Sequence, residues 1–217
     1  MSDPRTLAQS VPVADVLDAQ TALAREAAGR LGLRTVPLFR PVAGVGPLPD
    51  AARWAACLAG RAPGLDIIIG TTGRKMSAFY ALNPALRRLR RVPALGSVTA
   101  DAVERAAGAV CFDRPARRLA ARLSEAGARV WTYRFDYAVP ASPFGATHSI
   151  ELPFPFGTDA DWTTAPMLAG ADPHDIDILG RALRTAWLSF IRTGTPTTDT
   201  PWPPLTAAAP AVHRWHP

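Results

Sequence analysis

Cysteine, lysine and long apolar segments are all scarce in this sequence of 217 residues. Its two cysteines, Cys57 and Cys111, form no CxxC pair, which excludes a disulfide scaffold, and we expect both to be small buried hydrophobes. The longest strongly apolar run, Leu65 to Ile69, is far shorter than the roughly 20 residues of a membrane span. Residues 1–6 lack the apolar segment of a secretory signal peptide. We therefore expect a cytoplasmic protein with no membrane partner.

Motifs that bind cofactors are missing as well. The chain contains no dinucleotide fingerprint, no phosphate-binding P-loop and no HExxH zinc motif, so we expect no cofactor and no metal. A hydrophobic fraction of 48% and a charged fraction of 19% are typical of a globular protein. The length is sufficient for one good core, so composition alone permits a complete small enzyme.

The basic charge comes almost entirely from arginine. The formal net charge is +6, and 23 of the 24 basic side chains are arginine, which leaves Lys75 as the only lysine. The densest cluster lies in residues 87–91, after Asn83 and Pro84, which we interpret as the cap and the first residue of a short helix. Its leucines mark a buried face, so its arginines are expected to point to water. No aromatic side chain is interleaved with them, and we expect no nucleic-acid partner.

Hydrophobic periodicity predicts helices and strands in alternation. Two runs rich in β-branched and aromatic residues, 65–69 and 130–135, are typical of buried strands. The longest predicted helix covers residues 176–192, and Gly194 with Pro196 should end it. The other main predicted helices cover residues 13 to about 29, 51–58, 99–107 and 113–125, and extended loops are predicted over 33–50 and 138–172.

This order of elements indicates an α/β protein with a parallel sheet and flanking helices. Two strands form only a marginal sheet, so we expect the central sheet to be incomplete and residues 1–217 to form a single partial domain. Gly60 is expected to end the helix that begins at Ala51. Asp113 is expected to cap the helix that follows it, with Pro115 in the first turn.

A resemblance to a known family lies in residues 145–157, which read GATHSIELPFPFG. This segment resembles the catalytic-histidine loop of the type-B carboxylesterases, the family of the bacterial p-nitrobenzyl esterases and the cholinesterases. Further segments resemble the family in the same order, namely LDAQ at 17–20, FRPV at 39–42, IGTT at 69–72, VWTYRF at 130–135, AWLSFIRTGTP at 186–196 and PWP at 201–203. The resemblance implies the C-terminal part of an α/β-hydrolase fold and a serine esterase.

The resemblance assigns the general-base position of the family to His148. Such an esterase uses a serine in a Gly-x-Ser-x-Gly elbow, a histidine that takes its proton, and a carboxylate that orients the histidine. None of the eight serines in this chain has the two elbow glycines, and the glycine-rich oxyanion loop is missing too. We therefore expect a C-terminal portion of a hydrolase that is inactive alone.

Lys75 occupies the position at which the family carries its acid. The family pattern Gly-Thr-Thr-Arg-Asp-Glu-Met corresponds to GTTGRKM at residues 70–76, with Lys75 in place of the glutamate. Pointing inward, a lysine disfavours the imidazolium form of His148; pointing outward, it leaves that histidine without an orienting partner. The spacing does not favour Asp66 or Glu104 as a substitute acid, and we interpret Glu151 as structural.

The apolar side chains around the histidine loop and the three remaining histidines are further candidates for site residues. Five apolar side chains flank the loop, namely Phe144, Phe154, Phe156, Trp162 and Met167. They either line a pocket for the acyl or alcohol part of a substrate or pack the loop onto the rest of the domain. Three more histidines, His174, His213 and His216, are expected to be exposed to solvent and inert.

Two functions follow as alternatives. The first is hydrolysis of a small-molecule ester, once an N-terminal half completes the triad. The alternative is a non-catalytic esterase relic or protein-binding module, because the family includes members that have lost catalysis. In either case the unpaired sheet edge predicts exposed apolar surface and self-association of the isolated chain.

Overall fold

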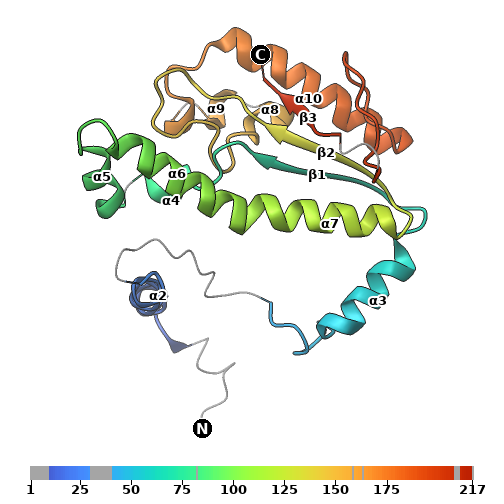
Figure 1. Ribbon diagram of the computed structural model, residues 1–217, viewed down its shortest axis with the longest axis horizontal. Helices are drawn as coiled ribbons and strands as arrows, with labels where there is room; N and C mark the ends of the chain where they lie inside the picture. Colours follow the sequence, from blue (N-terminus) through green and yellow to red (C-terminus); the bar gives the residue numbers. More distant parts are fainter. Residues whose placement is uncertain are drawn as a thin grey trace.

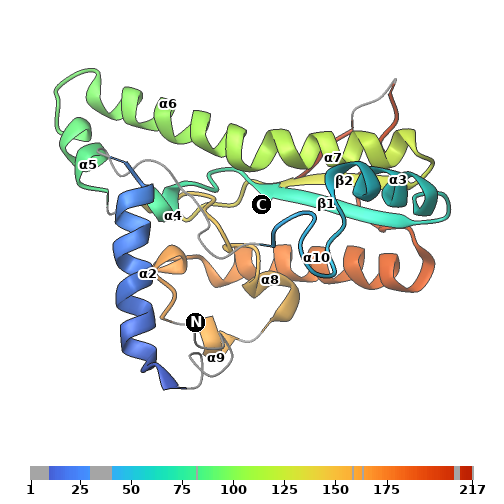
Figure 2. The same cartoon turned by 90° about the horizontal axis from the view of Figure 1, so that it is seen from below.

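Three parallel strands form the centre of the molecule. The computed structural model describes residues 10–29, 41–81, 83–157, 159–162, 164–207 and 211–216. Strand β1 covers Asp66–Thr72, β2 covers Arg129–Phe135 and β3 covers His213–Trp215, and they lie in the order β1-β2-β3. Helices α6 and α7 run along one face of this sheet and α10 covers the other (Figures 1 and 2). The predicted α/β architecture is confirmed.

The helices account for most of the remaining chain. Their bounds are α2 Val13–Ala27, α3 Ala51–Arg61, α4 Ser77–Tyr80, α5 Pro84–Arg90, α6 Gly96–Gly108, a π-helix Ala109–Asp113, α7 Arg114–Glu125, α8 Pro153–Phe156, α9 Asp159–Trp162, a 3-10 helix Pro166–Leu168 and α10 Pro173–Thr193. Across the described ranges, no helix combines the length and the apolarity that a membrane crossing requires. Residues 33–40 of the predicted loop lie outside the described residues.

Alternation along β2 divides the core between the two faces of the sheet. Val130 packs with Ala120 and Leu123 of α7, whereas Trp131 packs with Leu183 of α10. Successive side chains of a strand point to opposite faces, so both faces of β2 are covered by helices. Strand β1 pairs with β2 alone among the described residues, which leaves its other edge without a partner strand there.

Both predicted strands are present, and β3 is an addition that the sequence analysis did not predict. Strand β3 is only three residues long and pairs with the end of β2, where Tyr133 lies opposite His213. His213 is half-buried and stacks on Trp202 at 4.8 Å between ring centroids. The prediction that His213 is solvent-exposed is therefore wrong, whereas His174 and His216 are exposed as predicted.

The predicted helix boundaries at Asp113 and at Gly60 are wrong, and α6 and α10 each begin three residues earlier than predicted. Asp113 is not a cap, because its backbone is helical and α6 continues into α7 through the π-helix. The wider π-helical turn precedes Pro115, whose ring would crowd the carbonyl four residues earlier in a regular α-helix. Gly60 does not end α3, which continues to Arg61 just before Pro63.

The prediction for the two cysteines is wrong, whereas the prediction of the short arginine-rich helix is confirmed. Both Cys57 and Cys111 are exposed, so the expectation that they are buried hydrophobes is wrong. The short arginine-rich helix is confirmed as α5, where the Asn83 side chain accepts a hydrogen bond from the Leu86 amide and Leu86 is buried. Helix α2 is also present as predicted, yet it contains no buried residue and stands apart from the sheet layers in Figure 1.

Candidate active site

Two loops meet at the carboxyl ends of β1 and β2. Strand β1 ends at Thr72 opposite Phe135, the last residue of β2, so the segments that follow both strands leave the sheet at the same edge. The first of these loops contains Lys75 and the second contains His148. Ligand sites of open α/β sheets lie at this edge, because the loops there are held by the strands. The structure therefore brings the two predicted site residues into one region.

Hydrogen bonds join the two loops directly. The Arg74 amide donates to the Ala146 carbonyl at 2.7 Å, and the Ala78 amide donates to Thr147 Oγ1 at 3.0 Å. The Ser77 hydroxyl donates to the Phe144 carbonyl. Thr147 is 2% exposed and directly precedes His148. These bonds fix the backbone of the histidine loop relative to the loop after β1.

Helix α6 anchors the loop after β1 through an ion-pair network. Arg74 donates two hydrogen bonds to Glu104, both at 2.8 Å, and a third to Asp101 at 3.0 Å. Arg90 pairs with the same two carboxylates. Glu104 is 3% exposed, so its charge is compensated by these arginines. Glu104 thus anchors this loop to α6 through Arg74.

The His148 side chain is exposed to solvent and is flanked by two aromatic rings. Its ring centroid lies 5.6 Å from that of Phe79 and 6.3 Å from that of Phe112. Phe112 belongs to the π-helix, so α6 and α7 contribute to the site through their junction. The next residue, Ser149, has a positive φ of 66°, a conformation that a residue other than glycine adopts only where its surroundings impose it. The histidine is therefore held in a constrained loop.

Lys75 points inward and pairs with a carboxylate. Its Nζ atom lies 3.7 Å from Oε1 of Glu151, and 13% and 19% of the two side chains are exposed. The same Nζ atom lies 5.9 Å from the centroid of Phe112, a ring that also contacts His148. The second carboxylate oxygen of Glu151 is buried and has no hydrogen-bond partner among the residues that the structure describes. Lysine, glutamate and histidine thus surround one spot, with Glu151 paired to Lys75.

The electrostatics of the site keep His148 neutral. Partial burial lowers the pKa of His148 below its ordinary value of 6.5, and the positive charge of Lys75 lowers it further, while Glu151 opposes both effects. Burial, with a contribution from Glu151, raises the pKa of Tyr133 to about 12, so that phenol stays protonated. A neutral imidazole can accept a proton, but the nearby cation opposes the charged form that results.

Replacing Lys75 by methionine is expected to raise the pKa of His148. The change removes the cation that disfavours the imidazolium and leaves the Glu151 carboxylate, which favours it. NMR titration of the His148 ring protons measures this pKa in the chain alone. Lys75→Arg keeps the charge and serves as the control, with a pKa that stays below 6.5. A pKa that is equal in the methionine and arginine variants would contradict the proximity of Lys75 and His148.

The aromatic residues around the loop do not share one environment. Phe154 is fully buried and packs on Phe135 and Tyr137 at 5.0 and 5.3 Å between ring centroids, and Met167 packs against the same core. Phe156 is 72% exposed. The packing interpretation therefore holds for Phe154 and Met167. Within the part of the chain that the structure describes, no three side chains of the metal-binding types form a group.

Comparisons with known proteins agree with the sequence resemblance. The sequence model of the Carboxylesterase family matches residues 93–215. The probable N-octanoylanthranilate hydrolase AqdA2 of Rhodococcus erythropolis is 39% identical over 202 residues, which make up 93% of this chain and 43% of that protein. Para-nitrobenzyl esterase of Bacillus subtilis (strain 168) is 31% identical over 185 residues, or 76% of this chain and 37% of the esterase. The chain spans less than half the length of these relatives.

Solved structures give the same result for the fold. A PNB esterase and a thermophilic PNB esterase superpose on this chain with TM-scores of 0.72 and 0.68, at 25% and 28% identity. Each superposition covers 95% of this chain and 45% of the esterase. The small parallel sheet and its helices therefore represent part of an α/β-hydrolase fold. Because the family match covers more than half of its residues, this chain belongs to the carboxylesterase family.

Proposed function

We propose that this protein contributes the general base to a carboxylic ester hydrolase. The observation that carries this proposal is the place of His148, in a constrained loop at the carboxyl ends of parallel strands. Its lowered pKa makes it neutral near pH 7, as a base that takes a proton from a serine must be. Proton transfer to the imidazole would activate the serine for attack on the ester carbonyl and form an acyl-enzyme.

We further propose that the chain alone does not hydrolyse esters. None of its eight serines has the glycine spacing of a nucleophile elbow, and Lys75 takes the place of the acid. The serine and the oxyanion donors would come from an N-terminal half that completes the fold. The β1 edge is the place where further strands of that half would pair, because β1 has no second partner strand among the described residues.

The substrate class proposed is a small carboxylic ester. The names of two relatives point to different acyl bonds. The Bacillus subtilis enzyme is named a para-nitrobenzyl esterase, whereas the Rhodococcus erythropolis hydrolase is named for N-octanoylanthranilate, in which the acyl group is bound to nitrogen as an amide. A p-nitrophenyl ester is therefore the suitable first substrate, and N-octanoylanthranilate tests separately whether an N-acyl amide is also cleaved.

Co-expression tests the proposed role. The chain is assayed alone and together with the part of the Rhodococcus hydrolase that lies outside the 202 matched residues. We expect no hydrolysis by either part alone and slow hydrolysis by the pair, abolished by His148→Ala. His174→Ala, which changes an exposed histidine, is the matched control. A complex that forms without any activity would instead support the alternative, a non-catalytic protein-binding module.

The open sheet edge leads to a second measurement on the same samples. We propose that the isolated chain self-associates through β1 and binds hydrophobic dyes. Light scattering after size-exclusion chromatography should show oligomers that disappear when the complementing part is present. A monomer that binds no dye would contradict this proposal.

A further inference from the structure

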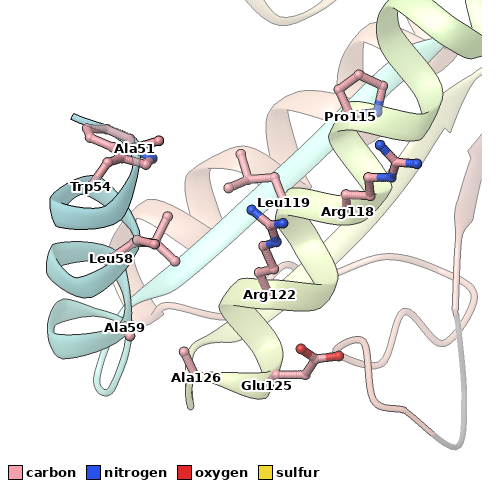
Figure 3. A pocket seen from close by; sticks show the side chains of 11 residues that line it. Ala51, Trp54, Leu58, Ala59, Pro115, Arg118, Leu119, Arg122, Glu125 and Ala126 are labelled. Atoms are coloured by element: carbon pink, nitrogen blue, oxygen red, sulfur yellow. The ribbon is translucent and has the colours of Figure 1, made fainter. Parts of the chain in front are cut away.

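A groove separates α3 from α7, at the end of the sheet opposite the His148 loop. It has a volume of about 770 Å³, and Figure 3 shows the side chains that line it. Its α7 wall, from Pro115 to Ala126, extends over about 16 Å at the α-helical rise per residue. Pockets for small molecules have this size, with mostly apolar walls and a few polar groups that orient the ligand.

The walls of the groove are mainly apolar, and large side chains are exposed in it. Trp54 of α3 is 56% exposed and Leu119 of α7 is 41% exposed. Leu58 of α3 also lines the groove and packs against the core cluster that includes Ala120 and Val130. Figure 3 shows Leu58 and Leu119 on facing helices. These surfaces could cover an apolar chain, which would remove the exposed indole and leucine from water.

Two arginines add positive charge to this apolar groove. Arg118 and Arg122 are four residues apart on α7, a spacing at which like charges destabilise a helix. In the described chain, neither side chain has an ion pair or a hydrogen bond, whereas Arg74 and Arg90 pair with Asp101. Figure 3 shows Arg122 extending along α7 toward Leu119. An anion bound here would relieve the repulsion between the two guanidinium groups.

One acidic residue also lines the groove, at its far end. Glu125 follows Arg122 by three residues, and Figure 3 shows its carboxylate turned away from α3. Figure 3 shows the Arg122 guanidinium beside Leu119 and that of Arg118 on the side of α7 away from α3, so Arg122 supplies the positive charge next to the apolar walls. One guanidinium group binds a carboxylate through two parallel hydrogen bonds, so a carboxylate matches Arg122 in charge and in geometry, and Arg118 adds positive charge nearby.

We propose that the groove between α3 and α7 binds a free amphipathic monocarboxylate, such as a medium-chain fatty acid. Its alkyl chain lies against Trp54, Leu58 and Leu119, and its carboxylate binds Arg122 and Arg118. The site is separate from His148, because α3 lies at the amino end of β1 and the histidine loop lies at the carboxyl ends (Figure 1). This binding does not depend on ester hydrolysis, so each proposal can fail without the other.

Calorimetric titration of the full chain with decanoate tests the site, with decanoate kept below the concentration at which it forms micelles. We expect saturable binding of one decanoate per chain. Decanol has the same alkyl chain without the charge and should bind about tenfold more weakly. Trp54→Ala should also weaken binding of decanoate, since it removes part of the apolar wall.

The arginines are tested by a matched pair of double variants. Arg118→Gln with Arg122→Gln should weaken binding of decanoate about tenfold or more. Arg87→Gln with Arg88→Gln removes the same net charge from exposed positions of α5 and should leave binding unchanged. The proposal is overturned if decanoate does not bind, if decanol binds equally well, or if the two double variants behave alike. Far-UV circular dichroism checks that each variant is folded.

Discussion

Lys75→Glu is expected to raise ester hydrolysis by the complemented enzyme by up to about 10⁴-fold, the loss that follows when a triad histidine lacks its orienting acid. The Lys75 side chain is largely buried and points toward the spot shared by His148 and Glu151. A carboxylate at this position would accept a hydrogen bond from the imidazole and stabilise its positive charge. The effect should appear in kcat for a p-nitrophenyl ester.

Variants of residue 75 with different charges separate two effects on hydrolysis, the removal of the lysine cation and the supply of an orienting acid. Lys75→Met removes the opposing cation without providing an acid, so its gain should be much smaller than that of Lys75→Glu. The new glutamate would lie close to Glu151, and Glu151→Gln combined with Lys75→Glu removes the repulsion between them. Unchanged activity in the glutamate variant, with the complex intact, would show that residue 75 is not the acid position.

Gly70→Ala is expected to destabilise the chain by about 3 kcal/mol or to prevent folding. A methyl group at Gly70 would lie 2.0 Å from Cε1 of Tyr133, much closer than carbon atoms can approach. Tyr133 cannot move away easily, because it packs edge-on against Trp187 and Trp202 at 5.3 and 6.3 Å between ring centroids. The clash would therefore be transmitted to α10. Urea unfolding, followed by circular dichroism, measures the change.

Gly60 provides the matched control for this substitution. It lies within α3, and beyond its neighbours and its own helix backbone no described atom lies within 4 Å of the position that a methyl group would take. Gly60→Ala should therefore stabilise the chain by about 1 kcal/mol through helix propensity. Tyr133→Ala removes the ring that causes the clash, so adding Gly70→Ala to Tyr133→Ala should cost much less stability than Gly70→Ala costs in the unchanged chain. A stable Gly70→Ala variant would contradict the close packing of Tyr133 on β1.

Local sequence signals predicted the elements that depend on local interactions. The Asn83 cap, the left-handed Gly194 after α10 and the β-branched run of β1 all appear in the structure. Strand β3 was missed because its three residues carry no pattern, and only pairing with β2 makes them a strand. The sequence around Asp113 is typical of a helix start, because an aspartate precedes a proline by two residues. No sequence signal reveals the π-helical turn that lets α6 continue through Pro115 into α7.

The candidate site was predictable in part, for a related reason. The motif around His148 identified the loop, and the sequence left the direction of Lys75 open. The structure adds that Lys75 points inward, that Glu151 pairs with it and that Phe79 and Phe112 flank the imidazole. Phe112 comes from the junction of α6 and α7, and no local signal connects that junction with the histidine loop. Such contacts depend on the packing of segments distant in sequence.

The parallel connections of the sheet have a consequence for how the chain folds during synthesis. Asp66 on β1 pairs with Arg129 on β2 across 63 residues of sequence, and Thr132 bonds to Ala211 across 79. Contacts of such long range form slowly, because much of the chain must be ordered before they close. During synthesis on the ribosome, the edge of β1 that pairs with β2 stays unpaired until β2 is made. The edge of β2 that pairs with β3 then stays unpaired until β3 is made. Until β3 emerges, a nascent chain therefore presents the β2 edge to aggregation in addition to the outer edge of β1.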